Sequence, residues 1–382
     1  MLGYSKAVEA SVQAMSIKYN NMVYDLKRQG VKVIVLSLGE AYFDIPLLPM
    51  DDLPYPQLYH YSHSRGIFEL RARIARYYAE EYGVPVDPET EIIVTAGSKA
   101  AIHFAMMSVL NPGDHVIMHE PMWVSYPEQA KLCYAEPVSI PYYETVYDYE
   151  KYVTEKTKLI VVNNPNNPRG QNLTHKEMAY LVDLARASGA YLLSDEAYAD
   201  FCLDEEFHSA GAFDPRKENV IVCNSLSKSW GLSGWRLGYV ITNEGLTNQL
   251  LKVNQHLITC PATILEYYMA KHFDQILKVT KPQMASLVRT RREIGMFMGS
   301  IGLKHLPGST TFYFFASIAP SRLTSEEFCT RLLMEEHICV VPGVGYGASC
   351  DSFVRVTVGT ETVEDIHYAL RKLKDLVEKT SA

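Results

Sequence analysis

The sequence predicts an α/β protein with a large domain, in which helices enclose a mostly parallel sheet, and a smaller α+β domain. The first observation is length, because 382 residues exceed what one compact hydrophobic core usually holds. The second is that short apolar strands alternate with helical stretches from about residue 91 to residue 242, as in parallel sheets buried on both faces. The third is a change of pattern after about residue 245, where a long helical stretch precedes shorter strands and helices.

The N-terminal part predicts one helix and one strand before an irregular stretch. Residues 5–30 have apolar side chains at helical spacing and predict a helix. The apolar run Val31–Leu38 predicts a short strand, and we expect both elements to pack with the small domain. Residues 41–60 are rich in Pro and Tyr and predict irregular structure, and a helix is expected over about Gly66–Tyr82.

The alternating part of the chain forms the predicted sheet. Its strands are expected at Glu91–Thr95, His115–His119, Leu159–Asn163, Tyr191–Asp195, Val220–Ser225 and Leu237–Thr242. Helices are expected at Lys99–Leu110, from Trp123 to Ala130 and at Thr174–Ser188, where Thr174 and Glu177 have the spacing of a capping box. Ligands of such sheets bind outside the carboxyl ends of the strands, so the functional site is expected at that edge.

The rest of the chain predicts the small domain. Leu246–Met298 predicts a long helical stretch with breaks at Pro261 and Pro282. Further strands are expected at Thr311–Ala316, Ile338–Val341 and Ser352–Val358, and helices at Ser325–Glu336 and Val363–Lys379. We therefore predict an N-terminal segment over residues 1–45, a large domain over residues 46–285 and a small C-terminal domain over residues 286–382.

Composition and charge exclude several classes of protein. The formal net charge is −8 at pH 7 and no Lys/Arg run stands out, so no nucleic-acid partner is expected. The 7 cysteines are odd in number and form no CxxC pair, so neither a metal site nor a disulfide framework is predicted. The sequence contains no run of about 18 apolar residues and no N-terminal signal pattern. We therefore expect no membrane partner and a cytoplasmic location.

Polar residues follow the predicted strands. Gly97-Ser98-Lys99 joins a strand to a helix, and a helix N-terminus with a glycine and a hydroxyl can bind a phosphate. A plain tight turn explains the same tripeptide. Asp195 ends another strand, where a carboxylate is costly unless a partner such as a protonated heterocyclic nitrogen neutralises it. Tyr198 is close enough along the chain to contact the same ligand.

A lysine and an arginine follow the next predicted strand. Lys228 is flanked by serines directly after Val220–Ser225. A desolvated lysine near other cations has a lowered pKa and becomes a nucleophile for carbonyl compounds. Arg236 could bind a phosphate with two hydrogen bonds. Each residue alone has an ordinary alternative, such as a solvated lysine or a surface arginine. Their shared position at the strand ends of one sheet instead indicates a single ligand site.

These motifs resemble the fold-type I enzymes that use pyridoxal 5'-phosphate (PLP), in particular the class I/II aminotransferases of the aspartate aminotransferase kind. The resemblance extends from about Val31 to Arg355. Its most specific parts are Asn163–Gly170, which matches N-x-P-N-N-P-x-G, Ser194–Tyr198, which matches S-D-E-x-Y, and Ser225–Gly238, which matches S-x-S-K…G-x-R-x-G. The resemblance implies the PLP-transferase fold type I, with its seven-stranded type of sheet, and PLP as the cofactor.

The resemblance implies a role for each matching residue. Lys228 is expected to form a Schiff base with PLP and to move a proton, and Asp195 to pair with the protonated pyridine nitrogen. Tyr198 and Asn167 are expected to hydrogen-bond the hydroxyl of the pyridine ring, and Asn167 also to contact the substrate. Trp123 is expected to stack on the ring.

The resemblance also assigns the phosphate and the substrate carboxylate. The residues expected at the cofactor phosphate are Gly97, Ser98, Lys99, Ser225 and Arg236. Tyr61 matches a tyrosine that reaches the phosphate of the neighbouring subunit, which implies a homodimer with shared active sites. Arg355 is expected to bind the substrate α-carboxylate, because a planar guanidinium suits a carboxylate, and Gly39 to contact it through the backbone.

Three departures from the family pattern leave the reaction and the substrate open. Arg169 stands where the family usually has Thr or Ser, and the segment 43–59 is short and Pro-rich where relatives carry a helix. Pro307–Tyr313 contains an added residue near the substrate side. Tyr42, Phe43 and Tyr313 suggest an aromatic-lined substrate pocket, but the sequence does not name the substrate.

The leading expectation is transamination, in which the amino group of an L-amino acid passes to a 2-oxo acid. The alternative is another PLP reaction on an amino acid, namely cyclisation, elimination, replacement, decarboxylation or oxidation. A non-catalytic PLP-binding module is disfavoured because no part of the chain remains for a DNA-binding domain. A nicotinamide dehydrogenase is disfavoured because Gly343-x-Gly345-x-Gly347 lacks the required fingerprint spacing.

Overall fold

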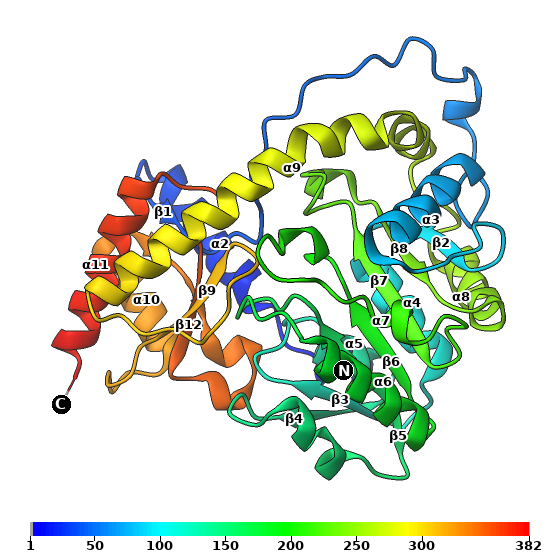
Figure 1. The fold of residues 1–382 in the computed structure, drawn as a ribbon. Helices are drawn as coiled ribbons and strands as arrows, with labels where there is room; N and C mark the ends of the chain where they lie inside the picture. The colour runs from blue at the N-terminus through cyan, green and yellow to red at the C-terminus, as the bar shows by residue number, and fades with distance from the viewer. Residues whose placement is uncertain (1–2, 382) are drawn as a thin grey trace.

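A computed structural model describes residues 3–381 of the chain. Its central sheet has seven strands in the order β2-β8-β7-β6-β5-β3-β4 (Figure 1). These strands are β2 Ile92–Thr95, β3 His115–His119, β4 Glu136–Ile140, β5 Thr157–Asn163, β6 Tyr191–Asp195, β7 Val220–Ser225 and β8 Gly238–Ile241. β8 is antiparallel to both of its neighbours, and the remaining pairs are parallel. The carboxyl ends of all strands except β8 therefore lie at one edge of the sheet.

Helices cover both faces of this sheet. On one face lie α4 Ser98–Val109, α5 Tyr126–Leu132 and α8 Glu244–Leu257, and on the other lie α3 Phe68–Tyr82, α6 His175–Ser188 and α7 Ala210–Phe213. Successive strand residues such as Ile92 and Ile93 belong to different apolar clusters, because their side chains point to opposite faces. The fold is thus an α/β arrangement with a mainly parallel sheet, as the sequence predicts.

A second, smaller group of elements lies beside the sheet. Its antiparallel sheet has the order β11-β12-β9. The strands are β9 Tyr313–Ser317, β11 Val341–Pro342 and β12 Phe353–Thr357, and α10 Ser325–Glu336 and α11 Val363–Lys379 pack near them. The N-terminal strand β1 Ile34–Val35 pairs in parallel with β10 Ile338–Cys339, and α2 Met15–Arg28 contacts β10 and β11. The N-terminal elements therefore pack against C-terminal elements that are distant from them in the sequence.

Helix α9 Thr263–Ser300 connects the two parts of the molecule and runs from α3 to α11 (Figure 1). It continues through Pro282, so the predicted break at this residue is wrong. A proline removes one backbone hydrogen bond, but buried side chains on either side, including Leu277 and Met284, hold the helix in the core. The predicted boundary between residues 285 and 286 falls inside this helix, and the division into domains stays a prediction.

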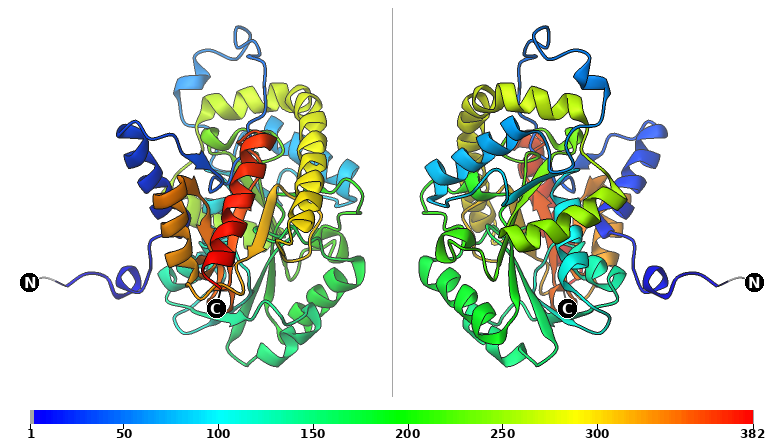
Figure 2. Two further views of the ribbon diagram at one scale, coloured as in Figure 1. Left: turned by 90° about the vertical axis from the view of Figure 1, so that its left-hand side faces the viewer. Right: turned by 90° about the vertical axis from the view of Figure 1, so that its right-hand side faces the viewer.

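Other expected elements differ from those observed. The helix predicted over residues 5–30 is two helices, α1 Lys6–Glu9 and α2, and the strand predicted over Val31–Leu38 is paired only at β1 because β10 is equally short. Helix α1 lies at the edge of the fold, where it contacts α5 (Figure 2). The run predicted as one strand, Ile338–Val341, is divided between two sheets. Strand β4 was not predicted, because its sequence begins Glu136-Pro137 and is not continuously apolar.

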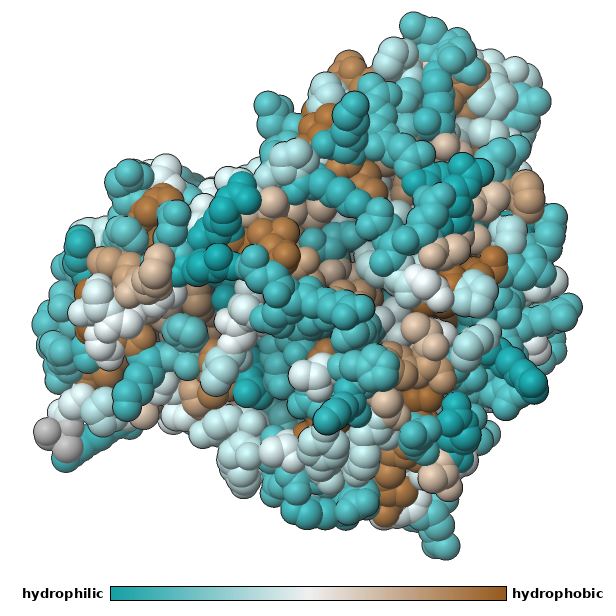
Figure 3. Space-filling view, in the orientation of Figure 1, coloured by the Kyte–Doolittle hydropathy of each residue, from teal (hydrophilic) through white to brown (hydrophobic). Residues whose placement is uncertain are grey.

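The irregular segment 41–60 lies along α9, where backbone groups of the segment bond to helix side chains. The amide of Asp44 donates to Gln283 Oε1 (2.8 Å), and the amide of Leu48 donates to the Tyr268 hydroxyl (3.2 Å). The face seen in Figure 3 is largely hydrophilic with small apolar patches. Among residues 3–381, no helix combines the length and the apolar character needed to cross a membrane.

Candidate active site

The strand ends of the central sheet open into a pocket of about 460 Å³. β5, β6 and β7 each end at this edge, so Asn163, Asp195 and Ser225 meet there although they lie far apart in the sequence. The predicted site residues that line the pocket are Gly39, Ser98, Lys99, Trp123, Asn167, Asp195, Tyr198, Ser225, Lys228, Arg236 and Arg355. The structure therefore brings together side chains from both parts of the molecule.

Lys228 lies just after the end of β7 with its amino group inside the pocket. Its Nζ donates a hydrogen bond to the carbonyl oxygen of Gly39. Burial, partly offset by the Glu40 carboxylate, lowers the pKa of Lys228 to about 8, and the nearby Arg355 and Arg236 act in the same direction as burial. About one amine in ten is therefore neutral at pH 7, far more than for an ordinary lysine, and the neutral form can act as a nucleophile or base.

Asp195 ends β6 and is held from two sides. The hydroxyl of Tyr126 donates to Asp195 Oδ2 (2.6 Å), and the amide of Ala197 donates to Oδ1 (3.2 Å). Burial raises the pKa of Asp195 to about 6, against these two hydrogen bonds and the charge of Lys228. The carboxylate is thus mostly ionised at neutral pH. Tyr126 was not found by sequence reasoning, because a tyrosine in a predicted helix carries no signal of this contact.

Tyr198 and Asn167 lie together on the pocket wall. Asn167 Nδ2 donates to the Tyr198 hydroxyl at 3.5 Å, and the amide of Asn167 donates to Asn163 Oδ1 at 2.6 Å. Asn163 Nδ2 in turn donates to the carbonyl of Asp195 (3.0 Å). This chain of bonds links the Asn-Pro loop after β5 to the end of β6. The Tyr198 hydroxyl also lies 2.9 Å from the hydroxyl of Tyr313, a partner that the sequence pattern did not reveal.

Arg355 projects into the pocket from the middle of β12 and is 4% exposed. Its Nη2 donates to the carbonyl of Ser37 (2.6 Å), and its Nη1 donates to Asn167 Oδ1 (3.3 Å). Its Nε has no hydrogen-bond partner among the residues that the structure describes. A buried guanidinium with no carboxylate beside it favours an anionic ligand, such as the carboxylate of a substrate.

A second group of cations lies at the N-terminus of α4. Among residues 3–381, neither Lys99 nor Arg236 forms an ion pair. Burial and the charge of Arg236 lower the pKa of Lys99. Gly97 has φ +82°, and a Cβ there would lie 2.5 Å from Arg236 Nη2, so only glycine leaves room for the guanidinium. These cations and the amides at the start of α4 form a site suited to a phosphate.

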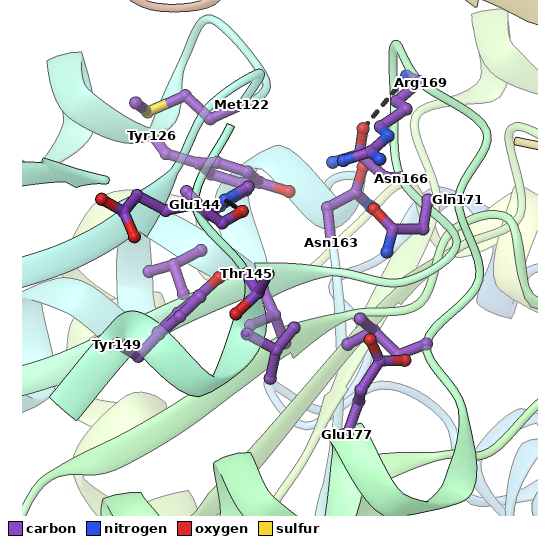
Figure 4. Close-up of a pocket in the computed structure, with 15 residues that line it drawn as sticks. Met122, Tyr126, Glu144, Thr145, Tyr149, Asn163, Asn166, Arg169, Gln171 and Glu177 are labelled. Atoms are coloured by element: carbon purple, nitrogen blue, oxygen red, sulfur yellow. Dashed lines mark hydrogen bonds between the residues drawn. The ribbon is translucent and has the colours of Figure 1, made fainter. Parts of the chain in front are cut away.

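Two predicted site residues, Tyr61 and Gly97, are not among those that line this pocket. Tyr61 is 86% exposed and is not among the residues that line it. Arg169 lines a separate cavity of about 150 Å³, together with Asn163 and Tyr126 (Figure 4). The Nε of Arg169 donates to the carbonyl of Pro307 (3.1 Å), so this residue joins the Asn-Pro loop to the segment before β9. The sequence marked Arg169 only as a departure from the family pattern; the structure places it in the lining of this separate cavity.

Comparison with known proteins agrees with this geometry. Residues 47–373 match the family described as "Aminotransferase class I and II". The chain is 30% identical over 370 residues to aromatic-amino-acid aminotransferase 2 of Thermococcus litoralis, covering 94% of this chain and 95% of the relative. It is 30% identical over 369 residues to aspartate aminotransferase of Pyrococcus abyssi, with the same two coverages.

The fold is similar to a solved structure of aspartate aminotransferase from Thermus thermophilus with maleate. The TM-score is 0.89 at 28% identity, covering 98% of this chain and 100% of the other. All these relatives are aminotransferases, so the alternative PLP reactions are not favoured. The chain belongs to the class I and II aminotransferases, enzymes that use PLP to move the amino group of an amino acid to a 2-oxo acid.

Proposed function

We propose that the pocket at the strand ends holds PLP and that two copies of the chain form a homodimer with shared active sites. The residues fit the cofactor at both of its ends. The unpaired cations Lys99 and Arg236 suit its phosphate, and Asp195, which is mostly ionised at neutral pH, suits a protonated ring nitrogen. When bound, PLP supplies an electron sink beside the Cα atom of the substrate.

The observation that carries the proposal is the amino group of Lys228, whose pKa of about 8 leaves it partly neutral inside the pocket. A neutral amine can attack a carbonyl compound and can accept the Cα proton of an amino acid held beside it. Arg355 would hold the α-carboxylate with two hydrogen bonds and so place Cα near Lys228. Gly39, whose carbonyl accepts from Lys228, lies in the same wall.

The ring of the cofactor would be held by three further side chains. Tyr198 and Asn167 would contact its hydroxyl, and Asn167 would also face the substrate because it bonds to Arg355. Trp123 would lie against the ring face, where its indole already packs under Lys99 Nζ at 5.1 Å. Ser98 and Ser225 would complete the phosphate site. The backbone of Gly97, which has no side chain, would approach the phosphate closely.

The homodimer is supported by apolar side chains that one chain leaves in solvent. Leu47, Tyr59 and Tyr61 are 93%, 74% and 86% exposed and belong to one stretch of the chain. Tyrosine-rich exposed surface is typical of protein interfaces. In a dimer, Tyr61 would reach the phosphate site of the partner. Sedimentation of the purified protein tests this, and a monomer at working concentration would contradict it.

We also propose a cytoplasmic location. The seven cysteines are all free thiols, as is usual in reducing compartments. Fractionation of cells that express the tagged full chain tests this location, and recovery outside the cytoplasm would contradict it.

The test of the reaction is an absorbance spectrum of the purified protein with added PLP, before and after a mixture of L-amino acids without a 2-oxo acid. We expect a visible cofactor band that shifts to shorter wavelength with the amino acids and returns when a 2-oxo acid is added. In Lys228→Ala this cycle should be abolished. A wild-type protein with no cofactor band would contradict the proposal, and a band that never returns with a 2-oxo acid would contradict transamination.

A further inference from the structure

The buried phenol of Tyr313 touches two functional side chains of the pocket at once. Its hydroxyl lies 2.9 Å from the hydroxyl of Tyr198. The guanidinium carbon of Arg355 lies over the Tyr313 ring, 4.7 Å from the ring centroid. We propose that Tyr313 is a positioning residue that orients the proton of Tyr198 toward the cofactor and fixes the guanidinium of Arg355 for the substrate carboxylate. This assignment rests on the proposed function of the pocket.

The first part concerns the direction of the hydrogen bond between the two hydroxyls. Each phenol has one proton, and only one of the two can lie between the oxygens. Arg355 lies over the ring of Tyr313, and its positive charge favours loss of the proton from that hydroxyl, so Tyr313 is the better donor. When Tyr313 donates, the proton of Tyr198 is free to point into the pocket. Asn167, at 3.5 Å, supplies only a weak second donor to Tyr198.

A donor to Tyr198 also makes Tyr198 itself a stronger donor, because hydrogen bonds in a chain polarise one another. The Tyr313 hydroxyl thus strengthens the contact that Tyr198 makes with a ligand oxygen. Gly39 lies beside this hydroxyl, and a Cβ at this position would lie 3.2 Å from the Tyr313 oxygen.

The second part concerns Arg355. β9 and β12 are antiparallel neighbours in which Arg355 pairs with Phe315 and Tyr313 with Thr357. Tyr313 and Phe315 are two residues apart on β9, so the side chains of Tyr313 and Arg355 lie diagonally on the same face. A guanidinium over a phenol ring at this distance is attracted to the ring face. The ring contacts one face of the Arg355 guanidinium, while the Ser37 carbonyl and Asn167 Oδ1 accept hydrogen bonds from its nitrogens.

The backbone of Tyr313 is itself anchored, so the position of the ring is not free. The buried Arg291 donates from Nε to the carbonyl of Tyr313 (2.9 Å), and the amide of Tyr313 donates to Thr311 Oγ1 (3.3 Å). Arg291 also donates from Nη1 to the carbonyl of Gly308 (2.8 Å). The segment that precedes β9 is therefore tied to α9 on the side away from the pocket.

Two substitutions separate the two parts of the proposal. Tyr313→Phe removes the hydroxyl and keeps the ring, whereas Tyr313→Leu removes both. Tyr239→Phe is the matched control, because Tyr239 is a buried tyrosine outside the pocket whose hydroxyl has no hydrogen-bond partner among residues 3–381. For each holoenzyme, we would measure kcat, KM for the amino acid and the midpoint of the pH titration of the cofactor absorbance.

We expect Tyr313→Phe to lower kcat by about five- to tenfold, the effect of one hydrogen bond, with KM changed by less than about twofold. The absorbance midpoint should move to higher pH, because a weaker donor stabilises an oxygen anion less. Tyr313→Leu should in addition raise KM by about fivefold or more through loss of the contact with Arg355. Tyr239→Phe should match the wild type in all three quantities.

The outcomes separate this assignment from the proposed function. A wild-type protein that binds no PLP would overturn the proposed function and this assignment with it. A wild-type protein that binds PLP, with Tyr313→Phe unchanged in kcat and in absorbance midpoint, would overturn the assignment alone. An equal rise in KM in Tyr313→Phe and Tyr313→Leu would refute the role of the ring. If the leucine variant does not fold, the phenylalanine variant alone decides the role of the hydroxyl.

Discussion

Replacing Arg355 by lysine keeps the positive charge and removes the planar fork. In the structure, Arg355 Nη2 donates to Ser37 and Nη1 donates to Asn167. A lysine ammonium has a single nitrogen, so it cannot make both of these hydrogen bonds and also two hydrogen bonds to a substrate carboxylate. Losing one charge-assisted hydrogen bond to the substrate costs about 2 kcal/mol, which corresponds to about a 30-fold lower kcat/KM for the amino acid. The assay is initial-rate kinetics at several amino acid concentrations.

The control for this experiment is Arg186→Lys, which changes a half-exposed arginine of α6 that pairs with Asp183 at the surface. Exposed pairs contribute about 0 to 1 kcal/mol, so this variant should keep the wild-type kcat/KM. A second control is an amine substrate without an α-carboxylate, for which the wild type and Arg355→Lys should be equally slow. If Arg355→Lys lowers kcat/KM by less than about threefold, Arg355 does not bind the carboxylate.

Three further predictions follow from the same geometry. Uptake of PLP by the apoprotein should accelerate as pH rises through about 8, because Lys228 loses its proton there; a midpoint near the ordinary lysine value would contradict its burial. Gly97→Ala should weaken PLP binding by at least about tenfold, because its Cβ would meet Arg236. Gly113→Ala, where φ is +86° and the space is open, should leave binding unchanged and cost only about 1 kcal/mol of stability. Burial raises the pKa of Glu196 from 4.5 to about 7, so its ionisation destabilises the fold as pH rises from about 4.5 through 7. Glu196→Gln should remove on the order of 3 kcal/mol of that pH dependence in the free energy of unfolding, and an unchanged dependence would contradict the shift.

The class of fold and most of the site could be predicted from local sequence. Strands Tyr191–Asp195 and Val220–Ser225 have the bounds that the sequence predicted, because each begins with an apolar run, as a parallel sheet buried on both faces requires, and ends in polar residues. Polar residues directly after such strands necessarily lie at one edge of the sheet. Asp195, Lys228 and Arg236 could therefore be assigned to one site before any coordinates were considered.

The features of the fold that the sequence did not predict depend on contacts between segments that are distant in the sequence. Residues 5–30 have a helical pattern, but two helices form because tertiary packing, which the pattern does not contain, sets where each one ends. The break expected at Pro282 is absent because burial on both sides of the proline outweighs one lost backbone hydrogen bond. Propensity acts within a few residues, whereas burial depends on the whole fold.

The sequence by itself determined the α/β class and the edge of the sheet where the site is expected, since both depend on patterns only a few residues long, and the family resemblance supplied most of the residues expected there. Only the tertiary structure decided that Tyr126 donates to Asp195, that Tyr313 contacts both Tyr198 and Arg355, and that Arg169 lines a separate cavity. These contacts join residues that are far apart along the chain. Their existence depends on the packing of strands and helices from both parts of the molecule, which no local pattern records.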